Sequence, residues 1–222
     1  MIDGKLSSVK KVLCLGAHSD DIEIGCGGTI LKLIRERPGI EFHWLVFSAS
    51  TERRREARKS AGEFLKGATE PRIQVANFRE SYFPDQWASI KDALEALKKK
   101  FEPHLVFTHF RDDRHQDHRV ISDLAWNTFR NHLILEYEIP KYDGDLGHPN
   151  VFVPLSEQLC NAKVSAILRH FATQASKHWF TKDTFMSMLR IRGVECAASH
   201  AEAFYCRKMT LSFARENHDP DA

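Results

Sequence analysis

Residues 9–28 read VKKVLCLGAHSDDIEIGCGG, an apolar run that changes abruptly into a histidine, two adjacent carboxylates and three glycines. Short apolar runs of this kind are typical of a strand buried on both faces of a parallel sheet. In an open α/β sheet, ligands bind in the crevice outside the carboxyl ends of the strands. The stretch therefore predicts a first strand at about 12–17 and a ligand site at its end, where the glycines would let the backbone turn tightly.

Strand-like apolar runs and amphipathic helical stretches alternate along the rest of the chain. The expected strands are 41–50, 72–78, 104–109, 133–140, 151–155 and 201–211. The expected helices are 29–37, 51–65, 85–101, 118–131, 156–174 and 183–192. This order predicts an α/β fold, with a Rossmann-like, mostly parallel sheet and helices on both faces. We expect a single domain over 1–222, with its core at about 9–211 and a flexible tail at 212–222.

Composition limits the classes of function. The chain has 222 residues, 42% of them hydrophobic, which is enough for one domain with a sizeable core. Its formal net charge of +2 argues against a nucleic-acid footprint or an anionic membrane surface. No apolar run approaches the ~20 residues needed to span a bilayer, and residues 1–11 lack the apolar region of a signal peptide. We therefore expect a cytoplasmic protein without nucleic-acid partners, and a homo-oligomer is compatible with the sequence.

The five cysteines are widely spaced and include no CxxC pair. This pattern favours reduced thiols and argues against both a disulfide framework and a thiolate zinc site.

A second cluster of polar residues, RHQDHR at 114–119, follows the strand expected at 104–109. Two strand-end clusters can converge on one metal ion. Zinc accepts imidazole nitrogen and carboxylate oxygen, and a catalytic zinc site uses three protein ligands and keeps a fourth position for water. His18, Asp21 and His118 meet that count, while Asp20, next to a ligand, would reach the water.

Simpler interpretations exist for each cluster alone. Asp20 and Asp21 would also suit the start of a helix, where aspartate is favoured. Asp117 and His118 would suit a solvated helix start, and one HxDH pattern is weak by itself. The basic run at 52–59 is more often a solvated helix face than a site. The two clusters together favour the metal site.

These residues also match a family pattern. AHSDDIE at 17–23 resembles the AHPDDxE signature of the PIG-L/LmbE-like zinc-dependent N-deacetylases, and HQDH at 115–118 resembles their HxDH signature. Arg53-x-x-Glu56 and AEAF at 201–204 are similar to two further family motifs, so that the resemblance extends from about Val9 to Phe204. Ser19 stands where the family usually has proline, which affects the stiffness of the turn more than its chemistry.

The resemblance implies a reaction and a metal centre. His18, Asp21 and His118 would hold one Zn²⁺ per chain, although another divalent ion is compatible with the same ligands. Asp20 would be the general base. The expected activity is removal of an N-acetyl group from an amino sugar or amino-sugar conjugate, which releases acetate and a free amine.

The resemblance also implies roles for three neighbouring residues. His115 would stabilise the charge of the tetrahedral intermediate, Asp117 would orient His115, and Arg53 would help to hold the substrate. Either Asp20 or His115 would serve as general acid. The alternatives are an amidase for a non-sugar N-acyl substrate and a non-catalytic module that binds metal or sugar. A dinucleotide-dependent dehydrogenase is disfavoured because the first turn lacks GxGxxG and carries two carboxylates where a pyrophosphate would lie.

Overall fold

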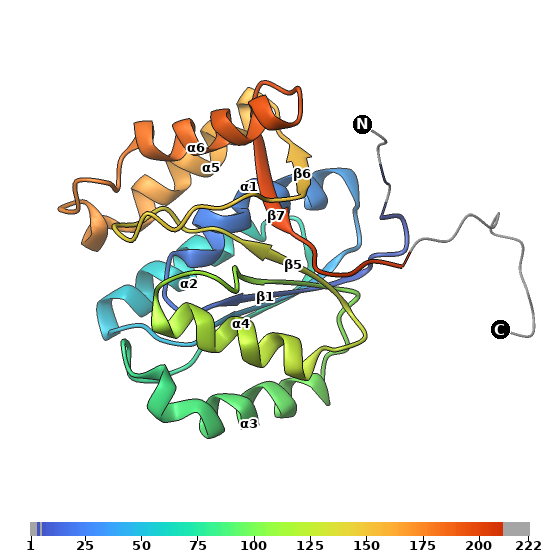
Figure 1. Ribbon diagram of the computed structural model, residues 1–222, viewed down its shortest axis with the longest axis vertical. Helices are drawn as coiled ribbons and strands as arrows, with labels where there is room; N and C mark the ends of the chain where they lie inside the picture. The colour runs from blue at the N-terminus through green and yellow to red at the C-terminus, as the bar shows by residue number, and fades with distance from the viewer. Residues whose placement is uncertain (1–3, 5, 211–222) are drawn as a thin grey trace, which may run out of the picture.

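A seven-stranded sheet organises the described part of the chain, which is residue 4 and residues 6–210 of a computed structural model (Figure 1). Its strand order is β3-β2-β1-β4-β5-β7-β6. The strands are β1 (Lys11–Gly16), β2 (Glu41–Val46), β3 (Thr69–Val75), β4 (Leu105–His109), β5 (Leu133–Tyr137), β6 (Val151–Pro154) and β7 (Ala201–Tyr205). β1 to β5 pair in parallel, and β7 is antiparallel to β5 and β6. The predicted mostly parallel sheet is confirmed, while the tail at 212–222 lies outside the described residues.

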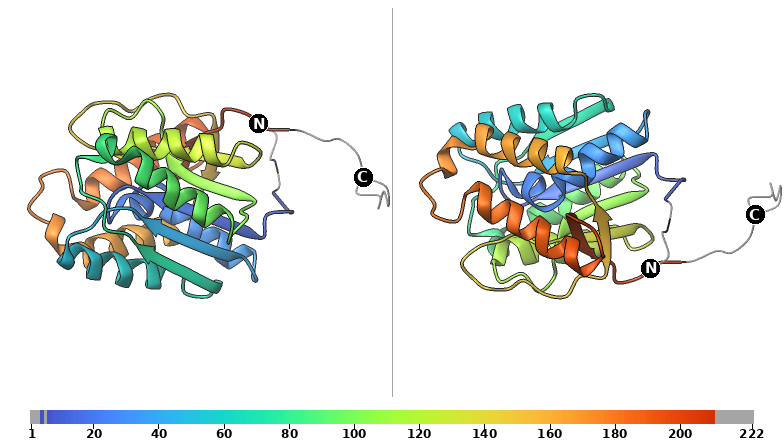
Figure 2. Two further views of the ribbon diagram at one scale, coloured as in Figure 1. Left: turned by 90° about the horizontal axis from the view of Figure 1, so that it is seen from below. Right: turned by 90° about the horizontal axis from the view of Figure 1, so that it is seen from above.

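Helices cover both faces of this sheet, as predicted (Figure 2). They are α1 (Asp21–Glu36), α2 (Thr51–Phe64), α3 (Trp87–Lys98), α4 (Gln116–Thr128), α5 (Glu157–His170) and α6 (Lys182–Glu195). β1 is buried on both sides: Val12 and Cys14 join the core under α1, α2 and α5, and Leu13 and Leu15 join the core under α3 and α4. Within the described residues, none of the helices combines the length and the apolar character that a membrane span requires.

The glycines after the first strand lie inside α1, and the expectation that they form a tight turn is wrong. α1 begins at Asp21, eight residues before the predicted start near Thr29. A Cβ on Gly25 would lie 2.1 Å from the Tyr137 ring, and one on Gly27 would lie 2.6 Å from the Phe64 ring. The glycines thus let β5 and α2 approach α1 closely, and this packing outweighs their low helix propensity of about 1 kcal/mol each.

The strand that carries the AEAF motif, β7, is tied to the middle of α1. The Glu202 carboxylate accepts the N–H groups of Gly28 at 2.7 Å and Thr29 at 2.6 Å, and it pairs with Lys163 of α5 at 2.6 Å. The Lys163 ammonium also donates to the carbonyl of Ile24 at 2.7 Å. These buried contacts fix the position of the helix whose first turn faces the candidate site.

Candidate metal and catalytic site

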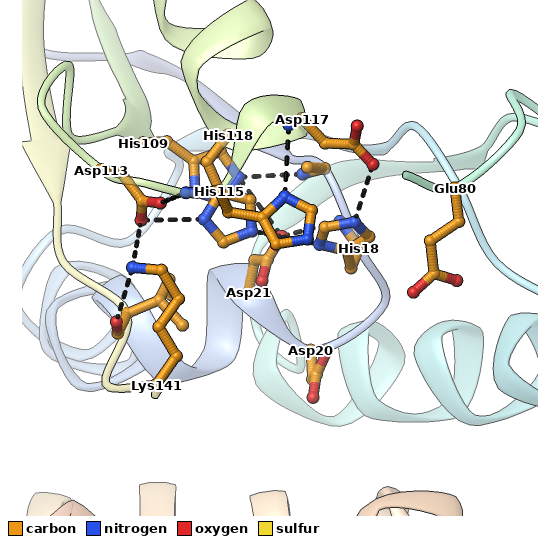
Figure 3. A network of polar contacts seen from close by, with 12 residues as sticks. His18, Asp20, Asp21, Glu80, His109, Asp113, His115, Asp117, His118 and Lys141 are labelled. Atoms are coloured by element: carbon orange, nitrogen blue, oxygen red, sulfur yellow. Dashed lines mark hydrogen bonds and ion pairs between the residues drawn. The ribbon is translucent and has the colours of Figure 1, made fainter. Parts of the chain in front are cut away.

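The two sequence clusters meet at the carboxyl ends of β1 and β4 (Figure 3). After β1 the chain passes through residues 17–20 into α1, and after β4 it passes through residues 110–115 into α4. β1 and β4 are parallel neighbours. The order in which the chain adds strands reverses at this pair: β2 and β3 follow β1 on one side, and the later strands lie beyond β4 on the other. Such a reversal is where ligands bind in open α/β sheets.

Three donor atoms form a small buried triangle in this crevice. His18 Nδ1 lies 3.1 Å from His118 Nε2 and 3.4 Å from Asp21 Oδ2, and His118 Nε2 lies 3.6 Å from the same Asp21 oxygen. Ligands bound tetrahedrally at 2.0 to 2.1 Å from zinc are about 3.3 to 3.4 Å from one another. The triangle therefore has the size and the donor chemistry that such an ion requires.

Each imidazole of the triangle is held from behind by a carboxylate. His18 Nε2 contacts Asp117 Oδ2 at 3.2 Å, and His118 Nδ1 contacts Asp113 Oδ2 at 2.9 Å. In metal sites, a hydrogen bond between the second ring nitrogen and a carboxylate fixes the orientation and the tautomer of the ring. The nitrogens that face the triangle, Nδ1 of His18 and Nε2 of His118, are thereby left as donors to a metal.

Asp117 does not orient His115 through its side chain, which differs from the expectation. Besides His18, its carboxylate accepts the N–H groups of Ser81 at 2.6 Å and Phe83 at 3.1 Å. Among the described hydrogen bonds, His115 is joined to Asp117 through the backbone: its Nδ1 accepts the Asp117 N–H at 3.2 Å as the N-cap of α4. The carboxylate is turned toward the 81–83 segment and so reaches His18 instead.

His115 is set up as an uncharged hydrogen-bond donor. Since its Nδ1 accepts a backbone N–H, the neutral ring carries its proton on Nε2. Burial lowers the pKa of His115, and the neighbouring His18 lowers it further, while Asp117 acts in the opposite direction. The ring is half-buried and its centroid lies 4.7 Å from that of His118.

The buried Asp20 carboxylate lies beside the triangle and is paired with Arg53. Asp20 occupies the N-cap position of α1 without a capping hydrogen bond from its side chain, so helix capping does not account for it. Its Oδ1 accepts from Arg53 Nη2 at 2.9 Å. Burial raises the pKa of the Asp20 carboxyl, and the Arg53 guanidinium partly offsets this rise.

Arg53 also contacts Glu80, whose side chain is exposed, at 3.2 Å through Nη1. Glu56, the other member of the Arg53-x-x-Glu56 pattern, accepts from the Thr173 N–H and hydroxyl and so holds the short turn at Ala172–Gln174. From the basic run at 52–59, Arg53 thus faces the site, whereas Arg54 binds the backbone at Val75 and Ala76.

Two further side chains compete for a place among the ligands. The donor atoms of His18, His115 and His118 lie within 4.8 Å of one another, as do those of Asp21, His109 and His118. His109 Nε2 already accepts the Ala17 N–H at 2.9 Å, which occupies its lone pair. His115 Nε2 carries the proton of the neutral ring while Nδ1 accepts the Asp117 N–H, so this nitrogen would bind a metal only if that hydrogen bond were given up. His118 belongs to both sets. The predicted ligands combine it with His18 from the first set and Asp21 from the second.

The model of the family described as PIG-L: GlcNAc-PI de-N-acetylase matches residues 13–129, which include most of β1, all of β4 and both clusters. The chain belongs to the PIG-L family.

Relatives of this PIG-L family member carry more than one activity in their names. The uncharacterized deacetylase YaiS of Escherichia coli K12 is 28% identical over 179 residues, which are 74% of this chain and 94% of YaiS. The N,N'-diacetylchitobiose deacetylase of Pyrococcus horikoshii superposes with a TM-score of 0.70 at 24% identity, over 89% of this chain and 84% of that one. GalB of Pseudomonas putida KT2440, a 4-carboxy-2-hydroxymuconate hydratase, has a TM-score of 0.73 at 16% identity, over 93% and 99%. These two structures share the fold, so the reaction has to be argued from the site.

Sequence reasoning about this PIG-L domain missed two site residues. Asp113 stands two residues before His115, in RDDRHQDH, and its proximity to the second cluster was a usable signal. Glu80 lies in a loop after β3 and has no such signal, because only the tertiary fold brings it to Arg53.

Any metal ion that binds at this PIG-L site has to displace a proton. Burial lowers the pKa of His18, but the carboxylates of Asp21 and Asp117 outweigh this effect and raise it to about 10. Burial and the neighbouring His109 lower the pKa of His118 to about 3. The two nitrogens that face each other at 3.1 Å therefore share one proton, which at pH 7 resides on His18.

We expect Zn²⁺ binding to release about one proton between pH 7 and 9, because metal binds only the neutral ring. The proton is held in the metal-free state and lost in the complex, so the apparent metal affinity rises by about tenfold per pH unit. Titration calorimetry in two buffers of different ionisation enthalpy measures the proton count. A count near zero would contradict the protonated His18.

Asp113→Asn should weaken Zn²⁺ binding by about 10- to 100-fold, because the amide no longer supplies the charge that orients and polarises His118. Competition with a chromophoric chelator measures the dissociation constant. Asp112→Asn is the matched control. The Asp112 side chain is 71% exposed, and among the described ion pairs it contacts only Arg111. Equal affinities for both variants would show that Asp113 does not support the ligand.

Proposed function

We propose that the protein is a metal-dependent N-deacetylase that hydrolyses the N-acetyl group of an amino sugar or amino-sugar conjugate to acetate and a free amine. The observation that carries the proposal is the triangle of His18, Asp21 and His118 donors with the Asp20 carboxylate beside it. Membership of the PIG-L family supports the amide bond as the target. The names of YaiS and the chitobiose enzyme point the same way.

We assign His18, Asp21 and His118 as the residues that hold the metal, with zinc as the ion that suits two imidazoles and a carboxylate. When bound, zinc lowers the pKa of a coordinated water to about 7 and polarises a carbonyl oxygen. Asp117 and Asp113 keep the two rings directed at the ion.

Asp20 acts as the general base in this proposal. Burial raises the pKa of Asp20, and its pairing with Arg53 favours the ionised carboxylate and offsets part of that rise, while it leaves the second oxygen, Oδ2, free of the guanidinium contact. Asp20 Oδ2 takes a proton from the attacking water while the oxygen of that water bonds to the acetamide carbon. A carboxylate in this role contributes about 10² to 10⁴ in rate.

His115 stabilises the developing oxyanion as a neutral donor through its Nε2–H group. This differs from an imidazolium, which the lowered pKa of His115 disfavours at neutral pH. When the intermediate collapses, the carbon–nitrogen bond breaks and the amine needs a proton. Asp20 received one in the first step and is the donor that we assign, so that the carboxylate is regenerated at the end of the cycle.

Arg53 and Glu80 suit the hydroxyl groups of a sugar. The guanidinium offers N–H donors and the exposed Glu80 carboxylate offers acceptors, side by side at 3.2 Å. Vicinal hydroxyl groups each donate and accept, so that a donor and an acceptor at this spacing can bind both. A plain acyl chain would use neither group.

The test is a screen for released primary amine and acetate in equal amounts, with the Zn²⁺-loaded protein and a panel of N-acetylated substrates. N-acetylhexosamines and their glycosides should be hydrolysed, whereas N-acetylated amino acids should be poor substrates. Faster hydrolysis of non-sugar amides would identify an amidase of another class. No hydrolysis of any amide by protein with a full complement of metal would favour a binding module.

A further inference from the structure

The rim of the site opposite Glu80 is formed by two loops that meet through their side chains. On one side Lys141, in the loop between β5 and β6, contacts Asp113 Oδ2 at 2.9 Å, directly behind His118. Figure 3 shows Lys141 and Glu80 on opposite sides of the histidine cluster. On the other side lies Lys177, in the loop between α5 and α6; burial raises the pKa of the Asp20 carboxyl, and the Lys177 charge is the smallest of those that lower it, after Arg53 and His18.

The residues next to these two lysines, Tyr142 and His178, contact each other and so join the two loops. Their ring centroids are 5.3 Å apart with the planes tilted by 47°, and the Tyr142 hydroxyl lies 3.5 Å from His178 Nδ1. Tyr142 is 70% exposed and His178 is also exposed. The contacts from Asp113 through Lys141, Tyr142 and His178 to Lys177 thus border the site from the His118 side to the Asp20 side.

The exposed ring of Tyr142 is carried by a loop that is pinned on both sides of it. Asp145 pairs with Lys141 and accepts the Arg114 N–H at 2.7 Å, next to the second cluster. Further along, the Gly147 N–H donates to the buried Glu138 at 2.8 Å, and Arg192 of α6 in turn binds Glu138. A large apolar ring presented to solvent by a fixed backbone loses little conformational entropy when it binds a ligand.

We propose that Tyr142 and His178 form a subsite for a second pyranose ring, glycosidically linked to the ring that carries the N-acetyl group. This inference rests on the proposed deacetylase function. The acetamide is placed at Asp20 and His118 and the hydroxyl groups of its ring at Arg53 and Glu80, so the other end of the sugar extends toward the opposite rim. The aromatic face of Tyr142 matches the apolar C–H face of a pyranose, and the imidazole of His178 matches its hydroxyl groups.

The subsite also lies outside residues 13–129, which the family model matches. Its residues therefore belong to the part of this chain that can set substrate length independently of the shared catalytic clusters. A disaccharide would contact both the Arg53 and Glu80 side of the site and the subsite at Tyr142 and His178. A monosaccharide would contact only the Arg53 and Glu80 side.

The test compares N-acetylglucosamine with N,N'-diacetylchitobiose for the Zn²⁺-loaded wild type and three variants. Tyr142→Ala should lower kcat/KM for the disaccharide by about five- to tenfold and leave that for the monosaccharide unchanged. Tyr142→Phe, which keeps the ring, should resemble the wild type. Leu146→Ala is the matched control, because it removes another exposed apolar side chain of the same loop.

Two outcomes would overturn the subsite while the deacetylase function stands: an equal effect of Tyr142→Ala on both sugars, or no effect on either. Full loss of the disaccharide preference in Tyr142→Phe would also contradict a stacking role. A wild type that holds its metal but hydrolyses neither sugar would instead refute the proposed function, and the subsite with it.

Discussion

Asp20→Asn should lower kcat by about 10² to 10⁴ with little change in KM, while the protein keeps its metal. The amide has the size of the carboxylate and can still accept a hydrogen bond from Arg53, but it cannot take a proton from water. Asp20 is not a ligand in the triangle of donors, so the bound ion should be unaffected. Steady-state kinetics and elemental analysis on the same preparation measure both effects.

Asp112→Asn again serves as a control, because it removes a carboxylate from the same edge of the sheet without touching the triangle. Turnover near the wild-type rate in Asp20→Asn, with the metal retained, would mean that another group is the base. A loss of metal in that variant would place Asp20 among the ligands.

His18→Ala and His118→Ala should each remove the bound ion, because only two protein ligands would remain where a catalytic zinc site uses three. We expect about one equivalent of zinc in the wild type and almost none in either variant after gel filtration, with activity lost in parallel. Elemental analysis provides the measurement. Thermal unfolding of the metal-free proteins shows whether the variants fold.

His115→Ala distinguishes between the two overlapping sets of donors. If His18, Asp21 and His118 hold the metal, this variant keeps the ion and loses turnover, as Asp20→Asn does. If His18, His115 and His118 hold it, the ion is lost. This variant is the informative one because His115 belongs to one of the two candidate donor sets and its Nε2 makes none of the described hydrogen bonds.

The fold and the centre of the site were accessible to sequence reasoning because their signals are local. β1 is an unbroken apolar run, and each cluster follows directly on a strand that is buried on both faces. Neighbouring parallel strands end at the same edge of the sheet. The sequence could therefore predict that two clusters far apart in the chain lie together. The same reasoning could not locate the start of α1, since Gly25 and Gly27 are explained by the Tyr137 and Phe64 rings that pack against them.

The supporting contacts depend on tertiary structure and were not accessible in this way. Asp117 contacts His18 rather than His115 because the 81–83 segment binds its carboxylate, and nothing local to HQDH encodes that segment. Glu80 reaches Arg53 for the same reason. The motif patterns thus predicted which residues lie near the site, but not which of them form hydrogen bonds or ion pairs with one another.

One metal ion, held between the ends of β1 and β4, is needed for amide hydrolysis in the function that we propose. The most direct test of this requirement is a titration of the metal-free protein with Zn²⁺, in which acetate release from an N-acetylated sugar is followed at each addition. We predict a rate that rises linearly and reaches its maximum at one equivalent, and that returns to the baseline with a chelator. Full hydrolytic activity in the metal-free protein would contradict the account.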